Sequence, residues 1–389
     1  MSPRLLHVVD DARQIGGAQI YLHGVAAGLA ARGWESGLLA RAMADGPFAW
    51  SSAITSPRDV EAAVAAFAPD VALLHSVGDA AVALRAARLV PTLSYEHDYR
   101  HICPGGGRFL RTPETFCAGG FGARCVVSPF TGACNSRRPD RLAASIGGVR
   151  AWRAVWPELA GVLCATGYVG ELLAEHGVDR QRIDVVGYFA RLPESEVPRV
   201  AAPRDILFAG RLTSPKGAHH LVAAFVQIAA RFPESRLVLA GGAPEPGVLA
   251  AAARAGCADR IVVPGWLSGA ALAALFAEAA VFVLPSLWPE PFGIAALDAQ
   301  ARGIPVVASA VGGLPEWIEH GVTGVLVPPG DPAALTEALA GILADPAAAR
   351  LLGERGRERA LGTHSLERHL ERLVPCLERA AALGGRTGR

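Results

Sequence analysis

Two cations in the second half of the chain have the types and spacing that binding a diphosphate requires. Arg211 and Lys216 follow the apolar run at residues 206–209 and enclose a short loop. A guanidinium can grip phosphate oxygens with two hydrogen bonds, and an ammonium adds a compact charge, so this pair could stabilise a departing diphosphate. No metal ion would then be required for that step. The alternative reading is an ordinary pair of solvated surface cations.

Two carboxylates, Glu290 and Asp298, flank a second loop, which follows the apolar run at residues 281–284. Glu290 would face whatever is attached to a bound phosphate. Asp298, about two turns away on the following helix, could accept hydrogen bonds from a polyol such as ribose. The start of that helix offers backbone N–H groups, reinforced by the helix dipole, to the phosphate itself. These N–H groups belong to Phe292, Gly293 and Ile294. The pattern predicts a nucleotide-sugar site, whereas a lone acid here would indicate only a buried Pro-rich loop.

His97 is the candidate for the reacting region in the first half. It follows a short predicted strand at residues 92–96 and precedes Asp98. Ligands of open α/β sheets collect at the carboxyl ends of the strands, and a neutral imidazole can donate to a sugar hydroxyl. We therefore predict His97 to be an active-site residue, although not a proton-abstracting base. A structural histidine is the alternative.

These acids, cations and His97 resemble the motifs of the retaining family-4 glycosyltransferases. The acid pair resembles their E-x7-E motif with Asp298 as the second acid, and Arg211 with Lys216 resembles their G-R-L…K-G motif. The resemblance implies an α/β protein of the GT-B fold, with two Rossmann-like domains facing each other across a cleft. In the family the first acid, here Glu290, holds hydroxyls of the donor sugar and the second holds the ribose. His97 resembles the histidine that touches the donor sugar.

The same resemblance implies a reaction class and a set of ligand-binding positions. It implies transfer with retention by same-face displacement, in which the leaving phosphate helps to deprotonate the acceptor, and no cofactor is required for catalysis. The donor would be a nucleotide-diphosphate sugar, with UDP favoured over GDP. The base would lie near Trp266, which could equally be core packing. The implied donor-binding residues are Gly16, Gly17, Gly210, Gly241, Trp266, Phe292, Gly293, Ile294 and Asp298.

Strands, glycine turns and helices recur along the chain in a way that predicts its domains. We expect an acceptor-binding Rossmann-like domain at residues 1–190, with a Cys-rich insertion at 103–134. A Pro-rich linker follows, and a nucleotide-sugar-binding domain is expected at residues 204–364. Residues 365–389 read as an amphipathic helix followed by a tail, and the resemblance implies that this helix returns to the first domain.

Four of the seven cysteines fall within the insertion. They are Cys103, Cys117, Cys125 and Cys134. Their spacing contains no C-x-x-C pair, which weakens the signal for zinc. Four thiols on one irregular segment in a reducing compartment nevertheless indicate a structural zinc site more than disulfides. A disulfide or redox role and unlinked buried thiols stay open as alternatives.

Composition limits the partners and the location. The chain has 389 residues, 51% of them hydrophobic, and a formal net charge of +1, which gives no electrostatic case for nucleic acid. No apolar run reaches the ~18 residues of a membrane span, and no signal peptide is visible, so we expect a cytoplasmic protein. The acceptor is expected to be a glycan, a lipid-linked glycan or a small molecule. Arginines at residues 137–153 hint at peripheral contact with the inner face of the membrane.

Two other functions compete with sugar transfer. A Rossmann-type oxidoreductase is disfavoured because the glycine pair Gly16-Gly17 lacks the G-x-G-x-x-G dinucleotide fingerprint. A non-catalytic nucleotide-sugar-binding protein is disfavoured because Arg211, Lys216 and Glu290 are all present.

Overall fold

Two parallel sheets organise the chain, and each belongs to a separate unit. The structure, a computed structural model, describes residues 2–13, 17–42, 50–54, 59–192 and 199–384. The first unit comprises Met1–Arg108, Ala118–Tyr188 and Leu366–Arg389, and the second comprises Phe109–Cys117 and Phe189–Ser365. Each unit is described below by itself.

The first unit is built on a seven-stranded parallel sheet in the order β3-β2-β1-β4-β5-β8-β9. Its strands are β1 (Arg4–Asp11), β2 (Glu35–Ala42), β3 (Ser52–Ile54), β4 (Val71–His75), β5 (Thr92–Glu96), β8 (Gly161–Cys164) and β9 (Ile183–Val185). β4 and β5 are buried along their whole length, as expected for parallel strands covered by helices on both faces. The direction of strand order changes between β1 and β4, so these strands mark the switch point at which ligands of such sheets bind.

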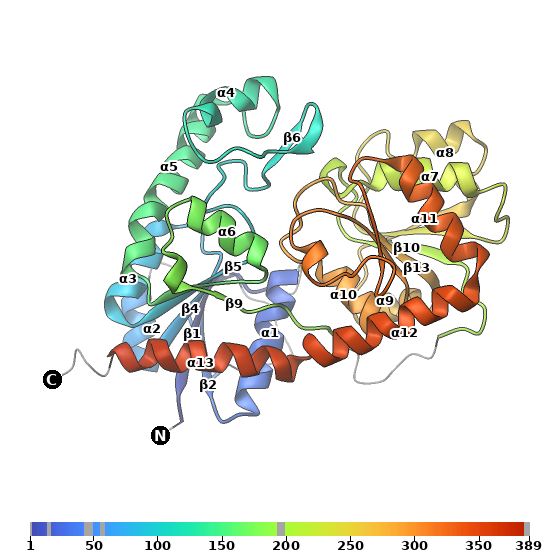
Figure 1. The fold of residues 1–389 in the computed structure, drawn as a ribbon. Coiled ribbons are helices and arrows are strands. Elements are labelled where there is room, and N and C mark those ends of the chain that lie inside the picture. The colour runs from blue at the N-terminus through green and yellow to red at the C-terminus, as the bar shows by residue number, and fades with distance from the viewer. Residues whose placement is uncertain (1, 14–16, 43–49, 55–58, 193–198, 385–389) are drawn as a thin grey trace. The chain divides into compact units, whose positions relative to one another are not determined.

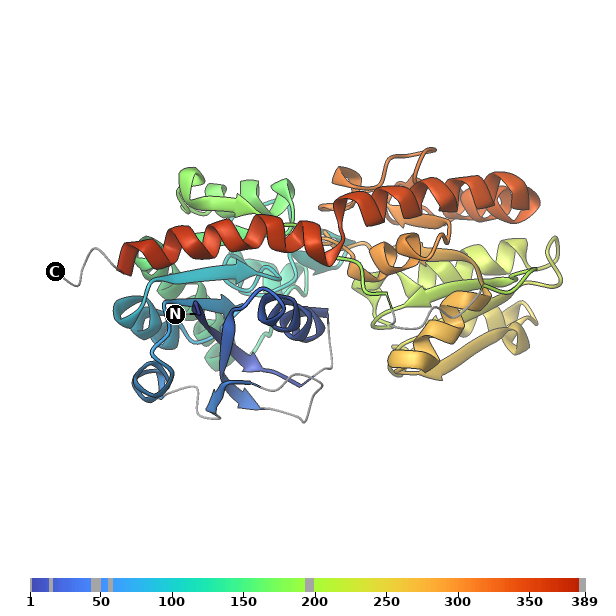
Figure 2. The ribbon, with the colours of Figure 1, turned by 90° about the horizontal axis from the view of Figure 1, so that it is seen from below.

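Helices cover this sheet, except that α4 lies away from it beyond α5 (Figure 1). They are α1 (Gly17–Ala30), α2 (Val60–Phe67), α3 (Ala80–Leu89), α4 (Arg124–Thr131), α5 (Pro139–Val155), α6 (Gly167–Glu175) and α13 (Leu366–Gly384), with the 3-10 turns η1 (Trp156–Glu158) and η2 (Arg180–Arg182). The C-terminal helix α13 packs on α1, β4 and β5, so the end of the chain belongs to the unit that contains its beginning (Figure 2). The Tyr21 hydroxyl lies 3.1 Å from Nε2 of His369, which fixes α13 to α1.

The second unit has a six-stranded parallel sheet in the order β12-β11-β10-β13-β14-β15. Its strands are β10 (Asp205–Ala209), β11 (Arg236–Ala240), β12 (Ile261–Gly265), β13 (Ala279–Leu284), β14 (Val306–Ser309) and β15 (Val325–Val327). Its helices are α7 (Ala218–Ile228), α8 (Ala250–Arg254), α9 (Gly269–Glu278), α10 (Ile294–Ala301), α11 (Pro332–Ala344) and α12 (Pro346–Thr363), with the 3-10 turns η3 (Ser214–Lys216), η4 (Ala258–Arg260) and η5 (Leu314–Glu316). Here the strand order changes direction between β10 and β13.

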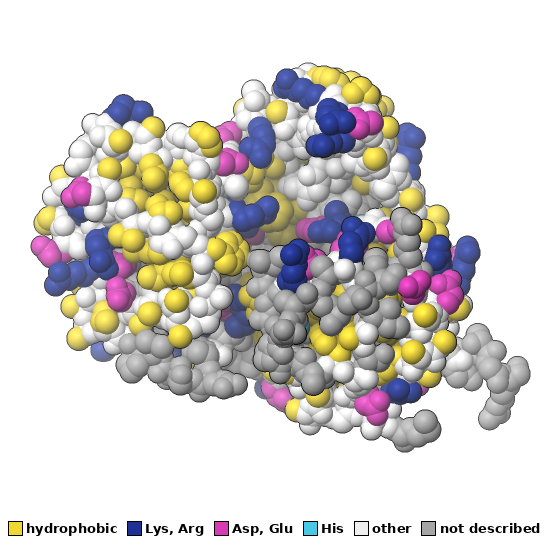
Figure 3. All heavy atoms as spheres, turned by 180° about the vertical axis from the view of Figure 1, so that it is seen from behind, with side chains coloured by type: hydrophobic (Ala, Val, Ile, Leu, Met, Phe, Trp, Pro, Cys, Tyr) yellow, Lys and Arg dark blue, Asp and Glu magenta, His cyan; other side chains and the backbone are white. Residues whose placement is uncertain are grey.

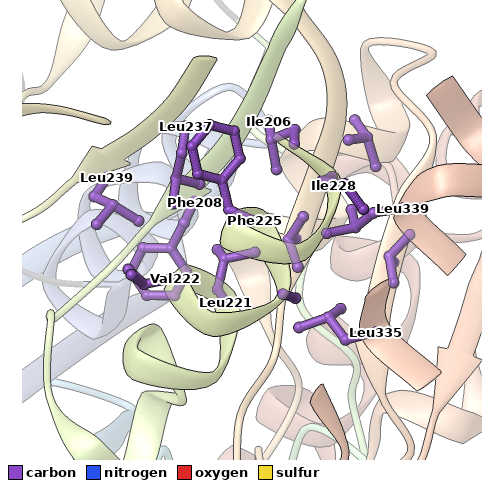
Figure 4. Close-up of a cluster of buried hydrophobic side chains, with 14 of the residues drawn as sticks. Ile206, Phe208, Leu221, Val222, Phe225, Ile228, Leu237, Leu239, Leu335 and Leu339 are labelled. Carbon is purple, nitrogen blue, oxygen red and sulfur yellow. The ribbon is translucent and has the colours of Figure 1, made fainter. Parts of the chain in front are cut away.

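Apolar strand residues and one face of α7 form the core of the second unit. Phe208 of β10, Phe225 of α7 and Leu239 of β11 are fully buried and belong to one cluster (Figure 4). Leu335 and Leu339 of α11 complete it from the next helix. The start of α11 is fixed locally, because the Asp331 carboxylate accepts from two backbone N–H groups and proline occupies the first turn.

A short antiparallel hairpin lies inside the predicted Cys-rich insertion but belongs to the second unit. It consists of β6 (Phe109–Arg111) and β7 (Glu114–Phe116). β6 contacts η3, and Arg111 pairs with Glu245 at 3.6 Å. The domain boundaries predicted from the sequence placed these residues in the first domain instead.

Charges of both signs are interspersed among apolar side chains on the face drawn in Figure 3, in keeping with the net charge of +1. Among the described residues, no helix combines the length and the apolar character needed to cross a bilayer.

Candidate active site

The loops after β10 and β13 meet at the switch point of the second unit. Because β10 pairs with β13 in parallel, both loops leave the same edge of the sheet. The backbone N–H groups of Leu287 and Trp288 donate to the carbonyl of Pro215 at 2.9 and 3.1 Å. Gly217 has a φ of 71°, and a Cβ there would lie 1.9 Å from the carbonyl oxygen of Pro285. Only glycine allows this approach, which brings the two predicted motifs together.

Lys216 and Glu290 form a buried ion pair across these loops. The Lys216 ammonium lies 2.7 Å from Oε1 of Glu290, and the two side chains are 15% and 4% exposed. The Ser286 hydroxyl donates to the same carboxylate oxygen, and the ammonium sits 4.6 Å from the ring centre of Trp288. Burial lowers the pKa of Lys216, whereas the Glu290 carboxylate opposes that shift. The structure thus brings together two of the four residues predicted to be catalytic.

Arg211 lies in the same loop as Lys216 but is exposed. Its charge contributes to the lowered pKa of Lys216, after burial, so the two cations are near each other electrostatically. The adjacent Gly210 meets the end of the next strand, because its N–H donates to the carbonyl of Ala240 at 2.9 Å. A Cβ on Gly241 would lie 2.0 Å from the Gly210 carbonyl. Two predicted donor-binding glycines therefore pack against each other.

The start of α10 has the form predicted for a phosphate site. Gly293 precedes the helix with a φ of 88°, and Ile294 is its first residue. Backbone N–H groups in a first helical turn have no intrahelical acceptor, so they can face an anion. Phe292 is buried and stacks on Trp317, whose indole N–H donates to the Phe292 carbonyl at 2.9 Å. This contact holds the loop in place.

Asp298 is placed differently from the predicted ribose contact. Its carboxylate is buried and accepts the backbone N–H of Arg191 at 2.8 Å and Nε of the same residue at 2.9 Å. Both carboxylate oxygens are therefore engaged by one residue of the linker. No ribose is needed to satisfy this carboxylate in the structure, and the ribose contact stays a prediction.

Trp266 follows the edge strand β12 and is 52% exposed. The alternative that it is a core residue is therefore wrong, and an accessible indole face suits stacking on a base. In the first unit, Gly17 is the first residue of α1. Gly16 lies outside the described residues.

His97 follows β5 as predicted, but its imidazole is fully engaged within the first unit. Nε2 lies 3.1 Å from Nδ1 of His75, and Nδ1 contacts the Tyr188 hydroxyl. The ring also stacks on Tyr95 with centroids 4.6 Å apart. Donation to a sugar hydroxyl would require one of these hydrogen bonds to open.

His97 is the first of three histidines whose rings contact one another in a row that leads into the sheet. Nδ1 of His7 lies 3.0 Å from Nε2 of His75, which in turn reaches His97. Burial, followed by the Arg100 and His369 charges, lowers the pKa of His97 to about 3, and burial also lowers the pKa of His7 and His75. All three rings are thus neutral at pH 7, and each nitrogen pair shares one proton, so the tautomers along the chain are linked.

The four cysteines of the insertion are divided between the units. Cys103, Cys125 and Cys134 belong to the first unit and Cys117 to the second, and no disulfide joins any of the seven cysteines, all of which are described. Over the described part of the chain, one group of three potential metal ligands has its atoms within 4.8 Å of one another, and it contains no cysteine. Zinc at the cysteines stays a prediction.

Comparison with known proteins identifies relatives of the second unit. A family model described as glycosyl transferases group 1 matches residues 203–345, which span β10 to α11. This stretch of the second unit is therefore similar to group 1 glycosyltransferase domains. The chain is 38% identical over 193 residues to the glycogen synthase of Mycobacterium tuberculosis, covering 49% of this chain and 45% of that protein. The chain thus spans about half the length of such curated relatives.

Solved structures of low sequence identity show the fold. Sucrose-phosphate synthase from Thermosynechococcus elongatus aligns with a TM-score of 0.73 and 23% identity over 98% of this chain and 100% of that one. Anabaena HepE in complex with UDP and glucose aligns with a TM-score of 0.70 and 19% identity over 96% and 99% of the two chains. The predicted GT-B fold, an α/β fold with two parallel sheets, is confirmed.

The second unit contains site residues that the sequence motifs did not predict. Ser286 and Trp288 lie between the apolar run at residues 281–284 and Glu290, so their nearness to Glu290 in the chain was an available signal. Gly312 supports Glu290 from another loop, because a Cβ there would lie 2.1 Å from the Glu290 carbonyl oxygen. Arg191 lies more than a hundred positions from Asp298, and no spacing pattern could have linked them.

Proposed function

We propose that the chain is a retaining glycosyltransferase that moves a sugar from a nucleotide-diphosphate sugar, UDP rather than GDP, to an acceptor. The buried Lys216–Glu290 pair at the switch point of the second unit is the observation that carries the proposal. The matched group 1 domain supports it. The choice of UDP is supported by HepE, which was solved with UDP and glucose.

Each site residue has one task in the proposed reaction. Arg211 and Lys216 bind the diphosphate and stabilise the charge that grows on it as the glycosidic bond breaks. The N–H groups at the start of α10 hold the phosphate in place. Glu290 keeps Lys216 oriented through Oε1 and accepts sugar hydroxyls through Oε2. The leaving phosphate takes the acceptor proton. Because Arg211 and Lys216 would already balance the charge of the leaving diphosphate, added Mg²⁺ or Mn²⁺ should not raise turnover.

Ligand-dependent thermal stabilisation tests the donor class. UDP-glucose, UDP-N-acetylglucosamine, GDP-mannose and NAD are added separately, because a ligand that binds only the folded state raises the melting temperature. Stabilisation by a UDP-sugar is expected. Stabilisation by NAD alone would favour the oxidoreductase. A UDP-sugar that stabilises the chain but is never turned over, even with a cell extract as acceptor source, would favour the non-catalytic binder.

The product decides the stereochemistry. Incubation with a labelled UDP-sugar and cell extract, followed by mass spectrometry, identifies the acceptor, and NMR of the product gives the anomeric configuration. We expect the donor's α configuration to be kept. A β product would replace the same-face mechanism with direct inversion.

One element of the first unit favours a lipid-linked acceptor over a free glycan or small molecule. Val126, Val127 and Phe130 on α4 are 50%, 58% and 55% exposed and share one helix face. Arg124 on the same helix and Arg137 after it are also exposed. Apolar side chains beside cations suit the surface of an anionic membrane. The proposed acceptor is therefore presented at the inner face of the membrane, and cytoplasmic location stays a prediction.

A further inference from the structure

Glu114, His219 and His220 form a compact group that the proposed reaction does not use. Glu114 is the first residue of β7, and the histidines are in the first turn of α7. Nε2 of His219 lies 2.8 Å and Nε2 of His220 lies 3.9 Å from Oε2 of Glu114. One potential ligand atom from each residue lies within 4.8 Å of the others. All three residues belong to the second unit.

The two histidines converge although the helix would normally separate them. Adjacent residues of an α-helix point about 100° apart. Here the ring centroids of His219 and His220 are only 4.2 Å apart, and both rings turn toward the same carboxylate. The Ser214 hydroxyl donates to the other oxygen of Glu114 and orients it. Carboxylates that bind metal ions are in turn hydrogen-bonded by such a second partner.

We propose that Glu114, His219 and His220 bind a divalent d-block cation, with Zn²⁺ as the expected ion. Imidazole nitrogens suit Zn²⁺, whereas Ca²⁺ and Mg²⁺ prefer oxygen ligands alone. Tetrahedral Zn²⁺ with bonds of ~2.0–2.1 Å places its ligand atoms about 3.3 Å apart. The observed separations of 2.8 and 3.9 Å bracket that spacing, so small side-chain movements complete the site. Water would occupy the fourth position.

The bound ion would be structural and would act on the hairpin. Glu114 is its ligand from the β6–β7 hairpin, and His219 lies three positions after Lys216. The ion would therefore fasten the hairpin to the first turn of α7, next to the 3-10 turn that carries Lys216. It takes no part in sugar transfer, and the inference does not rest on the proposed function.

Zinc binding to the full-length chain tests the site. Protein stripped with a chelator is titrated with Zn²⁺ against a chromophoric competitor, and bound zinc is measured by elemental analysis. His220→Asn and Glu114→Gln should each weaken this binding by at least about 100-fold, since losing even an outer partner of a ligand costs 10–100-fold. Arg111→Gln is the matched control, because it breaks the hairpin's ion pair with Glu245 without removing a ligand. It should leave zinc affinity within about threefold.

X-ray absorption separates this site from zinc at the cysteines. Nitrogen and oxygen neighbours at ~2.0–2.1 Å that disappear in His220→Asn but persist in Cys117→Ser would support the proposal. A shell of sulfur alone at ~2.3 Å, with zinc content unchanged in His220→Asn, would overturn it. Hydrogen exchange of the unmutated chain gives an independent readout. Zinc should slow exchange at residues 109–117 and 214–220, and unchanged exchange there would also count against the site.

Discussion

The Lys216 ammonium is buried between one carboxylate oxygen of Glu290 and the face of Trp288. A buried ion pair contributes little net stability, because removing two charges from water offsets their attraction. The pair is better understood as a preorganised charge. In the proposed reaction, Lys216 would meet the diphosphate with little reorganisation, and Glu290 would stay available to the sugar.

Arg211→Ala and Lys216→Ala should each lower turnover by roughly two to three orders of magnitude, the scale of losing a preorganised charge. The measurement is the rate of UDP release with a UDP-sugar and acceptor extract. Arg254→Ala at the exposed end of α8 is the control and should leave the rate unchanged. Near-normal turnover in both site variants would remove the phosphate-binding role.

The affinity for UDP should depend on pH through Lys216. Its pKa is lowered by burial from the ordinary 10.5, so the charge, and with it UDP affinity, should be lost as pH rises through that lowered value. In Glu290→Gln the neighbouring negative charge is gone, so the loss should begin at lower pH. Calorimetric titrations with UDP from about pH 7 to 10 measure this fall in affinity in the unmutated chain and in the variant. The same pH dependence of UDP affinity in both proteins would show that Glu290 does not act on Lys216.

At the scale of elements, the linker and α10 are joined by one contact. Arg191 of the linker binds Asp298 of α10 through both its backbone and its side chain. Arg302, one turn further along the chain, donates to the Arg191 carbonyl at 2.8 Å. The second acid of the motif therefore anchors the linker in this structure. If Asp298 also binds ribose, as predicted, the ribose and Arg191 would share one carboxylate.

Asp298→Asn separates these two roles. If Asp298 only anchors the linker, the variant should lose about 1–3 kcal/mol of unfolding free energy, and its UDP affinity should stay unchanged. This loss lies between the values typical of an exposed and of a buried ion pair. If it also binds ribose, UDP affinity should fall as well. Arg191→Ala is the matched variant, since it removes the competitor and leaves the acid. We expect it to destabilise the chain and to raise UDP affinity, and lower affinity would contradict ribose binding at Asp298.

The exposed face of α4 should bind anionic vesicles. Replacing both Val127 and Phe130 by Ser should weaken sedimentation with anionic liposomes roughly tenfold or more, because two apolar side chains no longer leave water. Leu351→Ser on α12 changes a side chain that is also 47% exposed and should have no effect. Equal binding by the unmutated chain, the double variant and Leu351→Ser would remove α4 from the proposed acceptor site.

At the scale of the whole molecule, the chain ends in the unit in which it begins. α13 follows α12 of the second unit but packs on α1, β4 and β5 of the first. Leu370, Leu373 and Leu377 of α13 are buried there. The first unit therefore becomes complete only after the second has been synthesised.

Leu373→Ala should destabilise the first unit by about 2–5 kcal/mol, the cost of a cavity at a fully buried leucine. Hydrogen exchange of β4 and α1 measures that loss, and UDP affinity in the second unit should stay the same. Leu383→Ala, at a position 47% exposed, is the control. Loss of UDP binding in Leu373→Ala would show that the two units are not independent in stability.

The sequence by itself predicted the elements that carry strong local signals. Residues 206–209 and 281–284 are apolar runs that end in glycine or proline, and such patterns specify buried strands and their loops without long-range information. Glu290 and Lys216 were identified because motifs record chemistry in short spacings. Asp331 and Pro332 likewise mark the start of α11 within a few neighbouring residues.

The tertiary structure alone decided which distant residues meet. Pairing of β10 with β13 placed Lys216 against Glu290, and packing joined Arg191 to Asp298 and His75 to His97. It also moved the hairpin of the Cys-rich insertion to the second unit and brought Glu114 to two histidines. These contacts depend on strand order and on the burial of whole faces, which no local spacing contains. The sequence therefore determined the chemistry available, and the fold decided which groups act together.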